Sequence, residues 1–104
     1  MKTFAEFWPF YVCEHSQSLT RRLHFVGTTL VVGVALFALG LGKVWLLLLL
    51  PICGYSFAWA SHFFVEKNRP ATFRYPFYSL LADFVMYKKM WFGQMDEEVK
   101  RCQR

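Results

Sequence analysis

The chain has 104 residues, of which 56% are hydrophobic and 20% aromatic, and its formal net charge at pH 7 is +5. This length allows a single domain, and the hydrophobic and aromatic content is far above that of an ordinary soluble domain. The positive charges flank long apolar runs instead of forming one basic patch, which argues against binding to nucleic acid. The composition therefore indicates a small membrane protein.

Residues 1–22 predict an interfacial segment that begins with a helix. Thr3 and Glu6 have the spacing of an N-terminal capping box. The serine-rich residues 16–18 predict a turn at the end of the segment. Aromatic side chains, which prefer the headgroup boundary of a membrane, recur on one side of the predicted helix at Phe4, Phe7, Trp8 and Tyr11.

Two uncharged runs follow, residues 23–42 and 44–65, and each predicts a membrane helix. A helix needs about 20 apolar residues to cross a hydrocarbon core about 30 Å thick. Lys43 is the only charge between the runs and marks the turn of a two-span hairpin. By the positive-inside rule both termini are expected in the cytoplasm, because basic residues flank the outer ends of the hairpin: Arg21, Arg22, Lys67, Arg69 and Arg74.

A polar loop leads from the hairpin to an amphipathic helix predicted over residues 76–93. This helix contains Asp83 and is too short to span, so we expect it to lie on the membrane surface or to re-enter. Residues 94–104 are expected to form a charged tail, which is frayed from Asp96 to Arg104. The predicted fold is an all-α integral membrane protein, a helical hairpin with flanking interfacial or re-entrant helices, in one domain over residues 1–104.

The cysteines are odd in number and widely spaced, at Cys13, Cys53 and Cys102. Thiols on the cytoplasmic side of a membrane are kept reduced. We therefore expect no disulfide framework.

Each long run carries a histidine near its charged end. His24 lies 19 positions before Lys43 and His62 lies 19 positions after it, so both imidazoles reach the same depth in a helical hairpin. Gly54, Ala58 and His62 are spaced by four, a pattern that lets helices approach closely and directs His62 into the hairpin. Because an ionisable group at a membrane boundary costs free energy unless it has a partner, both histidines are candidate site residues.

A carboxylate and a third histidine extend this candidate site. Glu66 follows His62 by four residues on one helical face, and two histidines with one carboxylate form the Fe(II) site of many non-haem oxygenases. His15 lies nine residues before His24 and joins the site only if the chain turns at residues 16–18. The competing interpretation is a chance spacing, with histidines that contact lipid headgroups.

Charged residues after the hairpin are candidates for supporting roles. Asp83 is a candidate hydrogen-bond partner for a histidine, and the alternatives are a metal ligand or a residue on the polar side of a surface helix. Arg69 and Arg74 are candidates for binding a substrate carboxylate, although the positive-inside pattern explains the same basic loop.

The residues around the histidines resemble a known family. His15, residues 20–27 and residues 57–76 are similar to the small membrane-protein family typified by the fungal 2-hydroxy fatty acid dioxygenase of phytosphingosine breakdown. The resemblance covers roughly residues 1–93. Its most specific part is the run His62-Phe63-Phe64-Val65-Glu66-Lys67-Asn68-Arg69-Pro70-Ala71.

This resemblance implies an activity and a ligand set. The activity is an Fe(II)-dependent α-oxidation, in which a 2-hydroxy fatty acid and O₂ give a chain one carbon shorter and carbon dioxide. The essential histidines of the family match His15, His24 and His62. His15 and Glu66 therefore compete for the third ligand position, since the resemblance favours His15 and the helical spacing favours Glu66.

Two other functions fit the same residues. A non-catalytic small membrane protein or subunit would use the histidines and the basic loop to bind lipid headgroups or a partner. A zinc-dependent lipid hydrolase would use the same ligands, with a metal-bound water as its nucleophile. For the dioxygenase, the expected partners are a membrane, a lipid or fatty acid substrate and O₂, with a homo-oligomer as a further alternative.

Overall fold

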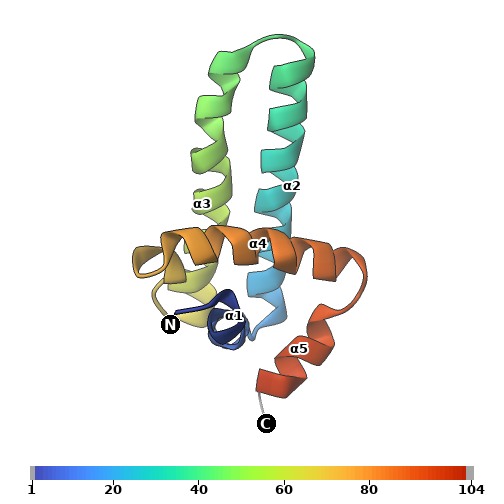
Figure 1. The fold of residues 1–104 in the computed structure, drawn as a ribbon. Helices are drawn as coiled ribbons and strands as arrows, with labels where there is room; N and C mark the ends of the chain where they lie inside the picture. The colour runs from blue at the N-terminus through green and yellow to red at the C-terminus, as the bar shows by residue number, and fades with distance from the viewer. Residues whose placement is uncertain (1, 103–104) are drawn as a thin grey trace.

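The structure, a computed structural model, describes residues 2–102 (Figure 1). Arg104, the predicted end of the charged tail, lies outside the described residues. Helices make up most of the described part, which contains no strand, so the all-α prediction is confirmed. In chain order the elements are α1 (Phe4–Cys13), α2 (Ser18–Gly40), η1 (Val44–Leu49), α3 (Leu50–Ala60), η2 (Ser61–Glu66), η3 (Ala71–Phe73), α4 (Pro76–Trp91) and α5 (Met95–Cys102).

The two arms of the hairpin are α2 and the continuous rod formed by η1, α3 and η2 (Figure 1). Each arm has 23 residues and is long and apolar enough to cross a membrane, with mean hydropathies of 2.0 and 1.7. Gly42 adopts a φ of +68° in the turn between the arms, a conformation that glycine adopts without steric cost. The arms approach closely at Gly27, where an added Cβ would lie 2.9 Å from the Cβ of Phe57.

The open end of the hairpin is covered by α1, α4 and α5, which we call the base. In Figure 1, α4 crosses the arms, while α1 and α5 lie beyond it, away from the hairpin turn. Thr3 caps α1 by accepting a hydrogen bond from the Glu6 amide, as the capping-box spacing predicts. The base has its own core of buried side chains, formed by Phe7, Tyr11, Val12, Ala82, Met86, Met95 and Val99.

Two expectations about the C-terminal region are wrong. Residues 95–102 form α5 instead of a frayed segment, because Met95 and Val99 are buried against the rest of the base. Cys13 and Cys102 are joined by a disulfide bond, because α5 packs beside α1 and brings their Cα atoms within 5.6 Å. Cys53 is a free thiol.

Candidate metal centre

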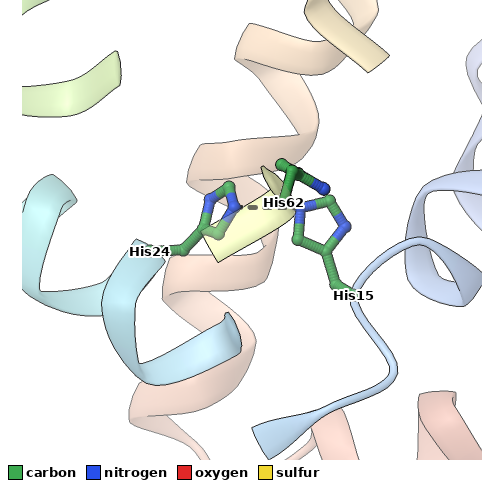
Figure 2. Close-up of side chains that lie close together, drawn as sticks. All are labelled: His15, His24 and His62. Atoms are coloured by element: carbon green, nitrogen blue, oxygen red, sulfur yellow. Dashed lines mark hydrogen bonds between the residues drawn. The ribbon is translucent and has the colours of Figure 1, made fainter. Parts of the chain in front are cut away.

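Three buried histidines from three segments meet where the arms reach the base (Figure 2). His15 lies in the turn after α1, His24 in the second turn of α2, and His62 in the π-helical segment η2. One ligand nitrogen from each ring lies within 4.8 Å of the other two. The Nε2 atoms of His15 and His24 are 3.1 Å apart. The structure therefore brings together the three histidines that the sequence singled out.

His15 reaches this cluster because the turn between α1 and α2 is fixed from two directions. The buried Arg21 guanidinium donates hydrogen bonds to the carbonyl oxygens of His15 and Ser16, each at 2.9 Å. The Glu66 carboxylate accepts hydrogen bonds from the Gln17 amide at 2.6 Å and from the Ser16 hydroxyl at 3.3 Å. A carboxylate at this position also complements the unpaired amides and the positive dipole end of α2.

Two of the three imidazoles have a hydrogen-bond acceptor at the outer nitrogen, and the third has a carboxylate nearby. His15 Nδ1 lies 2.7 Å from the Tyr11 carbonyl oxygen, and His62 Nδ1 lies 2.7 Å from Asn68 Oδ1. His24 Nδ1 lies 3.6 Å from Asp83 Oδ1. An acceptor at Nδ1 keeps the proton on that nitrogen and leaves the Nε2 lone pair free, the usual state of a metal-binding histidine.

This arrangement fits a divalent transition metal. The Nε2 atoms of His15 and His24 lie within hydrogen-bond distance of each other at 3.1 Å, and when each ring carries its proton on Nδ1 both Nε2 lone pairs are available to one cation. At typical metal–nitrogen distances of about 2.1 Å, two ligand nitrogens at a right angle lie about 3 Å apart. Burial, followed by the neighbouring His24 and His62, lowers the pKa of His15 well below its usual value, so this imidazole is neutral at physiological pH.

Asp83 connects the cluster to the core of the base. Its carboxylate accepts a hydrogen bond from the Tyr11 hydroxyl and lies beside His24. Burial raises the pKa of Asp83 to about 7, although the hydrogen bond from Tyr11 acts in the opposite direction. Tyr11 therefore touches the site twice, through its hydroxyl on Asp83 and through its carbonyl on His15.

Two spaces that share lining residues lie at the cluster. The smaller one, which we call the chamber, has a volume of about 10 Å³ and is lined by the three histidines, Tyr11, Ala58, Trp59, Thr72, Ser79 and Asp83. A space of about 10–15 Å³ holds roughly one water molecule, so the chamber suits a single ion or the head of a ligand. The larger one is an apolar cavity of about 240 Å³ between the arms and α4, and it shares His24, Ala58 and Asp83 with the chamber.

The other predicted site residues lie away from the chamber. Glu66 is hydrogen-bonded to the turn before α2 and does not belong to the group of nitrogens that meet. Arg69 and Arg74 are exposed and lie over the rings of Phe73 and Tyr75. Neither arginine lines the chamber or the apolar cavity.

Sequence reasoning assigned no role to three residues that shape the site. Asn68 accepts from His62, Tyr11 contacts Asp83 and His15, and Arg21 holds the His15 turn. The only sequence signal for Asn68 was its place in the run that resembles the family. Sequence patterns place Tyr11 at the membrane interface and Arg21 among the positive-inside residues. Neither pattern indicates the contacts that these side chains make in the site.

These features define an all-helical protein with a buried three-histidine cluster, fit for a metal, at the end of an apolar cavity. A family model described as 2-hydroxy-palmitic acid dioxygenase Mpo1-like matches residues 1–95. The chain therefore belongs to the Mpo1-like family, which is the family that the sequence resembles. Neither the curated proteins nor the solved structures contain a significant match.

Proposed function

We propose that this protein is a membrane-bound, Fe(II)-dependent dioxygenase that shortens 2-hydroxy fatty acids by one carbon. The observation that carries the proposal is the convergence of three buried imidazoles at the end of an apolar cavity. The name of the family supports a dioxygenase acting on a 2-hydroxy fatty acid.

The overall reaction converts a 2-hydroxy fatty acid and O₂ into the acid one carbon shorter, carbon dioxide and water. The bond that breaks joins the carboxyl carbon to the carbon that bears the hydroxyl. When bound, Fe(II) would supply Lewis acidity and O₂ activation. His15, His24 and His62 would hold the metal, and the acceptors at their Nδ1 atoms would fix the rings.

The substrate's apolar chain fits the larger cavity. Val31 of α2, Leu50 of α3 and Phe84 of α4 contribute to a lining that is mostly apolar. The cavity ends at His24 and Asp83, so a chain that occupies it would direct its carboxyl end toward the chamber. Leu80 and Phe84 are about half exposed beside this cavity, which would let a lipid enter from a membrane.

The proposal includes a membrane topology in which both arms span and both termini face the cytoplasm. Reporter fusions at the C-terminus and at Lys43 test it, since the two reporters should lie on opposite sides. A C-terminal reporter on the outer side would contradict the two-span hairpin.

Metal content and product formation test the activity. Protein purified in detergent without oxygen should contain about one Fe(II) per chain. Addition of O₂ and 2-hydroxypalmitic acid should yield the acid one carbon shorter, detected by mass spectrometry. Bound zinc without iron after iron-rich expression would favour the zinc-dependent hydrolase, and a metal-free protein would favour a non-catalytic membrane protein.

A further inference from the structure

Two side chains that line the histidine chamber carry polar atoms without a partner. Among the described residues, three buried side-chain polar atoms lack a hydrogen bond: Thr20 Oγ1, Trp59 Nε1 and Ser79 Oγ. Trp59 and Ser79 both line the chamber, although they come from different helices, α3 and α4. A buried donor without a partner is unfavourable, so two of them at one small space indicate a ligand that supplies acceptors.

Ser79 differs in this respect from other hydroxyl groups in the helices. Ser61 Oγ donates to the Ala58 carbonyl at 2.6 Å, and Thr29 Oγ1 donates to the Phe25 carbonyl at 2.8 Å. Such bonds within a helix are the ordinary solution for serine and threonine away from water. Ser79 is only 3% exposed and makes no such bond. Its hydroxyl is therefore free to donate to a ligand.

Trp59 restricts the chemistry of that ligand. The indole N–H is only a donor, so its partner must be an acceptor. The indole ring packs against the rings of Tyr55 and Phe73, with ring centroids 5.3 and 5.2 Å away. This packing fixes the orientation of the N–H group before a ligand arrives.

A long-chain acid would need donors for its carboxylate in this chamber. Arg69 and Arg74 do not line it, so the sequence-based candidates for this role are not available there. We propose that Ser79 and Trp59 bind the carboxylate of the fatty acid whose chain lies in the adjacent apolar cavity. This inference rests on the proposed function, which identifies the ligand as a fatty acid. It assigns recognition of the carboxylate to two neutral hydrogen-bond donors instead of to arginines.

The test compares palmitic acid with 1-hexadecanol, which has the same chain length but no carboxylate. Binding is measured with the full chain in detergent by displacement of a fluorescent long-chain fatty acid, without oxygen, in both the Fe(II)-loaded and the metal-free protein. Palmitic acid lacks the 2-hydroxyl group, so no turnover disturbs the measurement. Ser79→Ala and Trp59→Phe should each weaken palmitic acid binding about tenfold, because each removes a hydrogen bond to a charged group, and should leave 1-hexadecanol binding unchanged.

Two control residues come from the second arm of the hairpin, which is formed by η1, α3 and η2. Ser56 and Trp45 are exposed and line neither space, so Ser56→Ala and Trp45→Phe should change neither affinity. If Ser79→Ala does not fold, Ser79→Cys keeps the size of the side chain, weakens the donor and should lower the affinity for palmitic acid alone.

The outcomes separate this inference from the proposed function. Unchanged affinity for palmitic acid in both variants, or an equal loss for acid and alcohol, would overturn the carboxylate assignment. The iron content of both variants should equal that of the wild type, since neither residue is one of the three histidines. A wild-type protein without iron would overturn the dioxygenase, whereas the palmitic acid affinities of the metal-free protein would still decide the role of Ser79 and Trp59.

Discussion

The hairpin tip, the part of the two arms next to the turn at Gly42, differs from the base in how its apolar side chains are removed from water. Near the tip, Leu36 and Leu48 are 67% and 77% exposed, so large apolar side chains cover the outside of the arms. In the base, Phe7 and Met86 are 0% and 1% exposed, and Tyr11 donates a hydrogen bond to Asp83 beside the histidines. The tip depends on its surroundings to remove its apolar surface from water, whereas the base provides its own interior.

This difference explains where the histidine cluster lies. A neutral imidazole needs a hydrogen-bond acceptor for its N–H group. The side chains near the hairpin turn are mostly apolar and offer few such acceptors. The base supplies Asp83 from α4 and the Tyr11 carbonyl from α1, and the loop between η2 and η3 supplies Asn68. The arms supply His24, His62 and the apolar cavity. The candidate site therefore occupies the boundary between the two regions, and variants on either side of it should have different effects.

The largest expected effect comes from removing an imidazole. His15→Ala, His24→Ala or His62→Ala should weaken iron binding by more than about 100-fold, because loss of an outer partner alone costs about 10–100-fold. The iron content after anaerobic purification measures this, and circular dichroism should show unchanged helicity. Full iron content and normal turnover in His15→Ala would remove His15 from the ligand set and return Glu66 to the third position.

Removing an outer acceptor should have the next largest effect. Asn68→Ala leaves the His62 Nδ1–H group without its partner and should weaken iron binding about 10–100-fold. Asn68→Asp should restore most of the affinity, since a carboxylate oxygen also accepts this hydrogen bond. Equal iron affinity in Asn68→Ala and the wild type would show that the ring of His62 is held by packing alone.

A substitution in the arms should lower stability without removing a ligand. Gly27→Ala places a Cβ 2.9 Å from the Phe57 Cβ, and this overpacking should destabilise the hairpin by about 1–3 kcal/mol. Gly33→Ala and Gly40→Ala are matched controls, because nothing lies within 4 Å of a Cβ added at either position. Thermal unfolding in detergent should rank Gly27→Ala below the wild type, with both controls equal to it or more stable.

Glu66→Gln should have a smaller effect on iron binding than the preceding site variants. The amide oxygen still accepts a hydrogen bond from the Gln17 amide, so the turn that carries His15 should survive. We expect a loss of iron affinity of less than about tenfold, corresponding to a charge-assisted hydrogen bond replaced by a neutral one. A loss as large as that of His62→Ala would instead identify Glu66 as a metal ligand.

The smallest effect concerns a salt-bridge network in the base. Burial raises the pKa of Glu98, but hydrogen bonds from Trp8 and Lys89 and the charges of Lys89 and Arg101 outweigh it and leave this pKa lowered. The Glu98 carboxylate therefore stabilises the folded base fully at pH values above 4.5, the usual pKa of this group. This stabilisation is lost as the pH falls through the lowered pKa.

Glu98→Gln should consequently destabilise the base by about 1 kcal/mol or less at pH 7, and by less near pH 3. Thermal unfolding under reducing conditions, so that the disulfide does not mask the change, measures the difference between variant and wild type. Among residues 2–102, Glu97 forms an ion pair with Lys100 alone, across an exposed helix face, so Glu97→Gln serves as the control. An equal loss at both pH values would contradict the role of the Glu98 charge.

The arms and their two histidines could be predicted because local rules determine them. Hydropathy and length predict the helices, and the helical rise places His24 and His62 at one depth, on opposite sides of Lys43. His15 could not be assigned by spacing, since its position depends on the turn that Arg21 and Glu66 hold. Family resemblance pointed to it because resemblance carries information about tertiary contacts that local rules lack.

The contacts of the base could not be predicted in the same way. Met95 and Val99 lie four residues apart among charged residues, and this short apolar pair is weak evidence for a packed helix. Cys13 and Cys102 are separated by 89 positions, so no local pattern connects them. Glu66 was assigned to the face of His62, but the donors at the start of α2 attract its carboxylate.

The position of α5 has a consequence for how this protein can be divided. The family match ends at residue 95, the first residue of α5, so nearly the whole helix lies beyond the region that defines the family. A chain trimmed to that region would keep all three histidines. It would nevertheless lose Val99 from the core and the covalent link at Cys13, two residues before His15. The fold of this protein therefore extends beyond its family match, because α5 completes the core of the base.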